Sequence, residues 1–81
     1  MITGCQLNLL RELHKGPKTR KQQNSFLSLN SLRDAEELFL DNDLARIDEN
    51  DNREKVMTVT DKGERILAFC EQLVKEGVNF V

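Results

Sequence analysis

The stretch from residue 27 to residue 63 constrains the fold of this 81-residue chain most strongly, because its hydrophobic period changes twice. Its first part carries apolar residues at spacings of three and four, which is typical of an amphipathic helix. Two short segments of alternating apolar and polar residues follow, as in half-buried strands. Every residue between these segments, from 48 to 55, is polar. The stretch therefore predicts a helix, a β-hairpin with an exposed tip and the start of another helix.

Capping residues set the ends of the helix predicted over residues 28–42. Ser28 is a good N-cap, since its hydroxyl can accept a hydrogen bond from a backbone amide of the first turn. Asn42 or Asp43 supplies the positive φ that stops the helix, because both residue types tolerate that region. The buried stripe of this helix is expected to consist of Leu32, Ala35, Leu38 and Phe39.

The hairpin strands are predicted over residues 44–48 and 55–60. Their alternation points Met57 and Val59 toward the core and leaves Val56 on the outer face. A last helix is predicted over residues 61–76, with Thr60 or Asp61 as its N-cap. Its expected buried stripe consists of Ile66, Phe69, Cys70, Leu73 and Val74.

The region before residue 27 predicts one firm helix and one weak helix. Thr3 and Gln6 fit a capping box for a helix over residues 3–15, which the pair Gly16-Pro17 ends. The buried stripe of this helix is expected to consist of Cys5, Leu9, Leu10 and Leu13. The second helix, over residues 18–25 with Thr19 as N-cap, has no hydrophobic period and follows mainly from the layout around it.

Composition predicts a single domain over residues 1–81. Hydrophobic residues make up 38% and charged residues 32%, a globular balance that provides one small core. No apolar run approaches the ~20 residues that a membrane-spanning helix needs, and the N-terminus lacks a signal-peptide pattern. The expected location is therefore the cytoplasm.

The residue types that support catalysis or metal binding are sparse. Cys5 and Cys70 are expected to be small core thiols, with a disulfide or a metal site as the alternatives. His14 is the single histidine and suits the C-terminal end of a helix dipole. No Gly-rich phosphate loop, nucleophile motif or metal-ligand spacing occurs. We therefore expect no enzyme activity, no metal and no cofactor.

Charge is distributed unevenly along the chain. Residues 1–33 contain six basic residues and one acidic residue, a net charge of +5, whereas residues 34–81 contain six basic and thirteen acidic residues, a net charge of −7. A basic region on an acidic body can bind phosphates locally while the body limits non-specific association.

The ordered motifs of residues 18–63 resemble those of archaeal winged helix-turn-helix domains, found in small DNA-binding and chromatin-associated proteins. The matching residues are Lys18-Thr19, Leu27-Ser28, Leu38-Phe39-Leu40, Asp43-Leu44-Ala45 and Val59-Thr60-Asp61-Lys62-Gly63. The resemblance implies a mainly α fold with a small β-hairpin in the order α-α-α-β-β-α. It also implies a DNA-binding protein, with a small transcriptional regulator as the expected role.

The sequence departs from the family pattern in three places. The second helix has no apolar residue within Lys21-Gln22-Gln23, and Asp43 replaces the glycine of the turn after the third helix. The third helix sets four acids against the single cation Arg33; these acids are Asp34, Glu36, Glu37 and Asp41. Such a helix is poorly suited to bind DNA by itself.

For DNA binding, the resemblance assigns a role to seven residues. The expected phosphate contacts are Lys18, Arg20 and Lys21. Base or groove contacts are expected from Leu29, Asn30, Arg33 and Arg53. Arg33 could read guanine and Asn30 adenine, Leu29 could meet a thymine methyl, and Arg53 could enter a minor groove. The alternative for each charged residue is an ordinary solvated side chain.

Two further expectations concern protein partners. A winged helix with an acidic third helix and an exposed Leu29 could instead be a protein-interaction module that binds a basic or apolar partner. A homodimer is also expected, through residues 66–81, because DNA-reading winged helices usually bind two half-sites as symmetric dimers.

Overall fold

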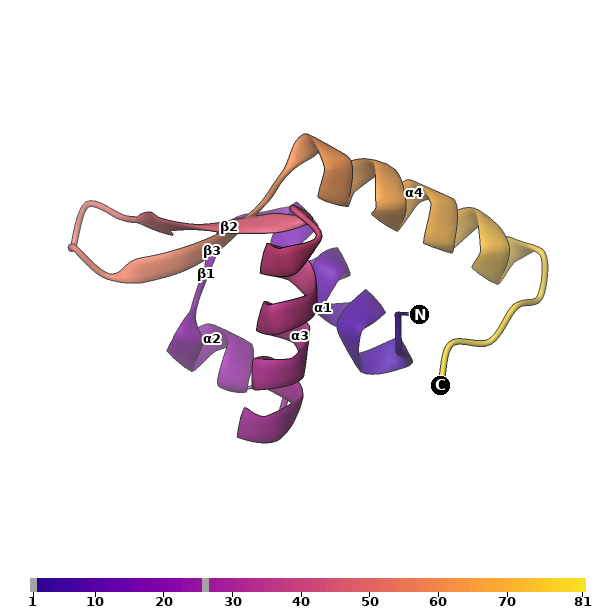
Figure 1. The fold of residues 1–81 in the computed structure, drawn as a ribbon, viewed down its shortest axis with the longest axis horizontal. Coiled ribbons are helices and arrows are strands. Elements are labelled where there is room, and N and C mark those ends of the chain that lie inside the picture. The colour runs from indigo at the N-terminus through magenta and orange to yellow at the C-terminus, as the bar shows by residue number, and fades with distance from the viewer. Residues whose placement is uncertain (1, 26) are drawn as a thin grey trace.

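The structure is a computed structural model, and it describes residues 2–25 and 27–81. The chain is mainly helical, with a small three-stranded antiparallel sheet. In chain order the elements are α1 (Gly4–Lys15), β1 (Lys18–Thr19), α2 (Arg20–Asn24), α3 (Leu29–Asp41), β2 (Ala45–Glu49), β3 (Lys55–Val59) and α4 (Asp61–Lys75). Figure 1 shows the β2–β3 hairpin projecting to one side of the molecule and α4 extending to the opposite side. This layout is compatible with the expected winged helix-turn-helix.

The sheet contains one strand more than the sequence predicts. Its order is β1-β3-β2, so β3 is the central strand, and Lys18 pairs with Met57 while Ala45 pairs with Val59. The prediction that a helix begins at Lys18 is therefore wrong. Thr19 has extended backbone angles and caps α2, and the two residues of β1 supply hydrogen-bond partners to an edge of β3 that would otherwise be open.

The capping predictions are confirmed. The Thr3 side chain accepts from the amide of Gln6 in a capping box, and the Ser28 side chain accepts from the amide of Ser31. Thr60 caps α4 by accepting from the amide of Gly63 at 3.0 Å. Asp43 has a φ of 58°, so it adopts the left-handed backbone conformation that usually favours glycine.

The core lies between α1, α3, the sheet and one face of α4. The largest side chains that are fully enclosed are Phe39, Leu9, Leu10, Leu13, Leu32 and Met57. The predicted stripe of α1 is wrong at Cys5, which is exposed, while Leu7 is buried in its place. Because the N-terminal turn of α1 meets the returning C-terminal segment on the Leu7 side, Cys5 faces outward. The amide of Gly4 donates to the backbone oxygen of Val81 at 3.0 Å in this contact.

The buried face of α4 is rotated from the predicted one. Gly63, Leu67 and Cys70 are buried, whereas Phe69 is 62% exposed. Gly63 sets this rotation, since a Cβ at that position would lie 2.0 Å from the Leu44 carbonyl oxygen. Because Gly63 packs against the backbone at Leu44, Leu67 and Cys70, four and seven residues later, lie on the same buried face of α4.

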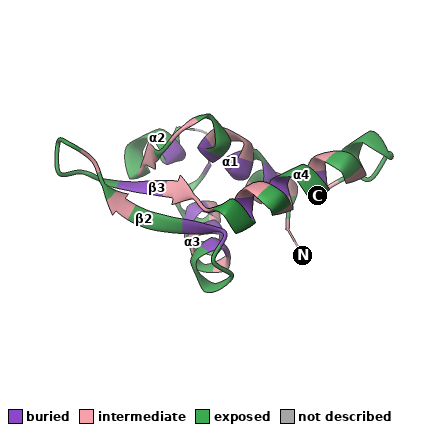
Figure 2. Cartoon of the chain, turned by 90° about the horizontal axis from the view of Figure 1, so that it is seen from above, coloured by how far each residue is buried: buried purple, intermediate pink, exposed green. Residues whose placement is uncertain are grey.

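Both faces of the central strand are covered. Met57 is buried as predicted, but Val56 is also buried, so its predicted outward position is wrong. Val56 pairs with Thr19, and α2 follows directly and packs against β3, which covers the second face. Figure 2 shows the buried part of β3 and the exposed tip of the hairpin. None of the helices in the described ranges is long and apolar enough to cross a membrane.

Candidate nucleic-acid interface

Helix α2 forms without an apolar stripe because polar side chains hold it at both ends and in its middle. The Thr19 amide donates to Gln22 Oε1 at 2.8 Å, which completes a capping box, and Ser25 Oγ donates to the Gln22 carbonyl at 2.6 Å. Gln23 is only 4% exposed, and its Nε2 donates to the Lys18 carbonyl at 3.0 Å. A buried amide thus takes the place of the apolar residue that the sequence lacks.

A hollow of about 460 Å³ lies between α2 and the β2–β3 hairpin, beside the contact of α2 with β3. Arg20, Lys21 and Lys55 border it together with the acids Glu36 and Glu54. The apolar residues that line it are Ile47, Val56 and Met57. The sequence analysis did not include Lys55 among the expected DNA contacts. Its place as the first residue of β3, directly after the polar hairpin tip, could have indicated it. We call this hollow the hairpin corner.

A second hollow, of about 320 Å³, adjoins the hairpin corner because Arg20 and Glu36 line both. It extends along α3, where Arg33 and Leu40 border it with the acids Glu37 and Asp41. The structure therefore brings Arg20, Lys21 and Arg33, all predicted from sequence, around one continuous surface with Lys55. We call the two hollows together the composite surface.

Arg20 is not available in the way that the sequence suggests. Its guanidinium forms an ion pair with the Glu36 carboxylate and donates a hydrogen bond to it through Nη2. This pair connects α2 to α3, and the Arg20 side chain remains half exposed. A phosphate would have to compete with Glu36 for this cation.

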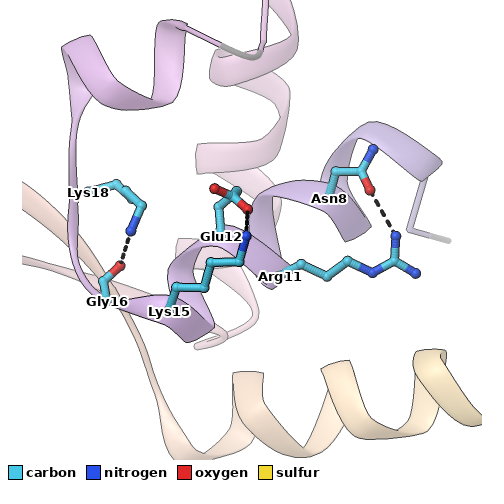
Figure 3. A network of polar contacts seen from close by, with 6 residues as sticks. All are labelled: Asn8, Arg11, Glu12, Lys15, Gly16 and Lys18. Carbon is cyan, nitrogen blue, oxygen red and sulfur yellow. Dashed lines mark hydrogen bonds and ion pairs between the residues drawn. The ribbon is translucent and has the colours of Figure 1, made fainter.

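Lys18 lies apart from the composite surface. Its Nζ donates to the Gly16 carbonyl at 3.0 Å, beside the Lys15–Glu12 ion pair of α1 (Figure 3). The hydrogen bond from Lys15 holds the pKa of the Glu12 carboxyl below its usual value. Lys18 and Lys21 both line a hollow of about 430 Å³ on this side, so Lys21 connects Lys18 to the composite surface.

Leu29 and Asn30 are exposed in the first turn of α3, close in sequence to Arg33, but they line neither hollow of the composite surface. That first turn contains no acidic residue. Within the described ranges, no ion pair involves Arg33.

Arg53 lies at the hairpin tip, with a φ of 60°. The Asn50 side chain shapes this tip by accepting from the amides of Asn52 and Glu54 at 3.0 and 2.9 Å. Arg53 is exposed but lines neither hollow of the composite surface. On β2, Arg46 donates to Asp48 at 2.9 Å and lowers the pKa of that carboxyl.

A larger hollow, of about 710 Å³, lies between α1 and α4, away from the hairpin. Two basic side chains of this hollow contact acids, since Arg11 pairs with Glu71 and His14 Nδ1 lies 2.6 Å from Glu64 Oε2. His14 occupies the last turn of α1, as predicted, and the contact with Glu64 connects that turn to α4. These pairs hold the two helices together, so this hollow is a weaker candidate for an anion site than the composite surface.

The composite surface consists of two adjoining hollows that both cations and acids border. Compared with known proteins, the chain matches no family model, no curated protein and no solved structure.

Proposed function

We propose that the protein is a winged helix-turn-helix that binds double-stranded DNA, with transcriptional regulation as its role. The β2–β3 hairpin is the wing in this proposal, and α3 is the helix that approaches the major groove. The observation that carries it is the composite surface, where Arg20, Lys21, Arg33 and Lys55 border adjoining hollows. Cations from a helix pair and a projecting hairpin can contact separate phosphates of one duplex.

Each cation has a distinct role in the proposed complex. Lys21 and Lys55 contact phosphates, and Arg20 joins them once its pair with Glu36 opens. Arg33 and Asn30 face base edges from the exposed side of α3, where Arg suits guanine and Asn suits adenine. Lys18 adds a phosphate contact beyond Lys21, and Arg53 at the wing tip enters a minor groove.

The acids of the surface make this binding weak and sensitive to salt. Glu36, Glu37, Asp41 and Glu54 line the same hollows as the cations. With about four phosphate contacts, the logarithm of the affinity falls against the logarithm of salt with a slope of about −3.6. A fourfold rise in salt then weakens binding by about 150-fold.

A second candidate function is the binding of a basic protein segment to α3. Leu40 is 38% exposed and lies beside Glu37 and Asp41, which form no ion pair among residues 2–25 and 27–81. An apolar side chain with acids around it suits an amphipathic basic partner. Such a partner would bind α3 without contacting the hairpin. Lys55 therefore contributes to binding in the DNA proposal and does not contribute in the protein-binding one.

Fluorescence anisotropy with a labelled duplex tests the DNA proposal. We expect binding at about 25 mM salt that is largely lost by about 200 mM. Lys21→Ala, Arg33→Ala and Lys55→Ala should each weaken it, whereas Lys75→Ala, which removes the same charge from the far end of α4, should have little effect. The absence of binding at low salt, or equal effects of all four variants, would reject DNA binding and favour the protein-interaction module.

A further inference from the structure

The hollow between α1 and α4 has two regular helical walls. Its α4 wall consists of four residues at spacings of three and four, Glu64, Leu67, Ala68 and Glu71. Its α1 wall has the same spacing and consists of Asn8, Arg11, Glu12 and Lys15, with His14 beside them. Residues at these spacings share one side of a helix, so the two walls border one space of about 710 Å³. A cleft of this volume is large enough for a small organic molecule.

The centre of the α4 wall is apolar and small. Leu67 is 6% exposed and belongs to the core, whereas Ala68 beside it is exposed. The methyl group at position 68 leaves open the space that a longer side chain would occupy. Leu67 and Ala68 therefore form an apolar patch that the side chains of α1 leave uncovered.

Two contacts between the helices flank this apolar patch. Arg11 Nη2 lies 2.6 Å from Glu71 Oε1, and His14 Nδ1 lies 2.6 Å from Glu64 Oε2. Glu64 precedes Ala68 by about one turn of α4 and Glu71 follows it by about one turn, so the contacts lie at opposite ends of the patch. They fix the distance between α1 and α4 without filling the space between them.

The charge of the hollow favours a cation over an anion. Its lining residues include three carboxylates and two permanent cations, so their formal charge is −1 with the histidine neutral. Both cations are already engaged by the protein. The guanidinium of Arg11 donates to Asn8 as well as to Glu71, and Lys15 donates to Glu12 (Figure 3).

Glu64 is the least neutralised of the three acids. Glu71 and Glu12 each pair with a permanent cation. The partner of Glu64 is His14, which adds no charge while its ring is neutral. The second carboxylate oxygen of Glu64, Oε1, receives no hydrogen bond from any residue that the structure describes. This oxygen belongs to a side chain one turn from Ala68, so a negative charge adjoins the apolar patch.

We propose that this hollow binds a small organic cation that has a flat apolar body and a protonated amine. The apolar body covers Leu67 and Ala68, which removes their surface from water. The ammonium group donates to Glu64 Oε1 in a charge-assisted hydrogen bond. This site shares no lining residue with the composite surface, so it goes beyond the DNA proposal and does not depend on it.

Three probes with one indole ring test the preference for a cation. Tryptamine ends in an ammonium group, tryptophol in a hydroxyl group and indole-3-acetate in a carboxylate. In NMR titrations of the ¹⁵N-labelled full chain, tryptamine should bind with a dissociation constant of about 1 mM. Tryptophol should bind about tenfold more weakly, since it lacks the charged hydrogen bond, and indole-3-acetate more weakly still. Equal affinities for the three probes, or shifts that avoid the amides of Leu67 and Ala68, would overturn the proposal.

Filling the hollow tests the place of the apolar body. Ala68→Leu puts a larger side chain into the open space and should prevent detectable binding of tryptamine. Gln72→Leu adds an apolar side chain of the same size at an exposed position of α4 outside the hollow, and it should leave the affinity unchanged. Tryptamine binding that survives Ala68→Leu, or that both variants weaken equally, would place the probe elsewhere and reject the site.

Glu64→Gln tests the partner of the amine. The substitution keeps the shape of the side chain and removes its charge, so tryptamine should bind about tenfold more weakly while tryptophol binds as before. Glu76→Gln, which removes the same charge at the end of α4 outside the hollow, should affect neither probe. A distortion of the helices would weaken both probes alike. An equal loss for both probes in Glu64→Gln, or no loss for tryptamine, would show that Glu64 does not bind the amine.

Discussion

The guanidinium of Arg20 on α2 is paired with the carboxylate of Glu36 on α3, so the most central cation of the composite surface is partly neutralised. Glu36 is the less exposed partner of the two. The pair contributes to the packing of α2 on α3, yet it competes with any phosphate. An exposed ion pair of this kind contributes up to about 1 kcal/mol to stability, so a phosphate can displace it.

Glu36→Gln should therefore strengthen DNA binding. The change removes one negative charge from the surface and frees Arg20 for a phosphate contact. We expect the affinity to rise several-fold at low salt, because Arg20 no longer has to leave Glu36. The salt slope should stay close to that of the wild type, since Arg20 contacts a phosphate in both complexes. Anisotropy titrations at four or five salt concentrations measure both quantities.

Glu71→Gln is the matched control for this change. It removes the same charge and also frees an arginine, Arg11, but in the hollow between α1 and α4. Its effect on the affinity for DNA should be small, and its affinity should depend on salt as that of the wild type does. Equal gains from the two substitutions would mean that net charge alone governs binding, contrary to a defined surface.

Gln23 should be important for stability although it is polar and lies in the shortest helix. In Gln23→Ala, the Lys18 carbonyl loses its side-chain donor and the enclosed space around position 23 is left empty. We expect a loss of about 1–3 kcal/mol in the free energy of unfolding, measured by urea denaturation. Asn24→Ala, at the exposed neighbouring position, should change it by less than about 0.5 kcal/mol. Similar losses in the two variants would show that Gln23 does not anchor α2.

Local signals predicted the helices well because each cap is a short-range interaction. Thr3, Ser28 and Thr60 cap the helices that they were expected to cap, and Asp43 adopts the positive φ expected at the end of α3. Such contacts join residues that are close in sequence, so one sequence contains the information they need.

Long-range contacts account for the parts that the sequence did not reveal. The strand character of Lys18–Thr19 depends on pairing with β3, almost forty residues away. The outward position of Phe69 depends on Gly63 meeting Leu44. The candidate site shows the same division, since Arg20 and Lys21 were visible as a basic cluster, but the pairing of Arg20 with Glu36 required the packing of α2 on α3.

Gly63→Ala should be the most destabilising single methyl addition at a glycine in this chain. The added Cβ would lie 2.0 Å from the Leu44 carbonyl oxygen and 2.7 Å from Val59 Cγ2, so backbone must move. We expect a loss of about 3 kcal/mol in the free energy of unfolding. Gly77→Ala separates steric overlap from backbone strain, because Gly77 has a φ of 93° and an added Cβ there would meet nothing within 4 Å. Strain alone should cost about 1 kcal/mol at Gly77, and a loss equal to or larger than that at Gly63 would contradict the steric argument.

The two thiols should differ in reactivity and in their effect on alkaline stability. Burial raises the pKa of the Cys70 thiol above its ordinary value of 9.0, whereas Cys5 is exposed. An alkylating reagent should modify Cys5 rapidly and Cys70 only on unfolding, as mass spectrometry of timed samples would show.

Above pH about 9 the unfolded chain loses the Cys70 proton while the folded chain retains it, so the free energy of unfolding should fall as pH rises. Cys70→Ala removes this contribution and leaves every other titratable side chain in place. The difference in unfolding free energy between wild type and variant should therefore shrink from neutral pH to pH about 10. Parallel pH profiles of the two proteins would contradict the raised pKa of the Cys70 thiol in the folded chain.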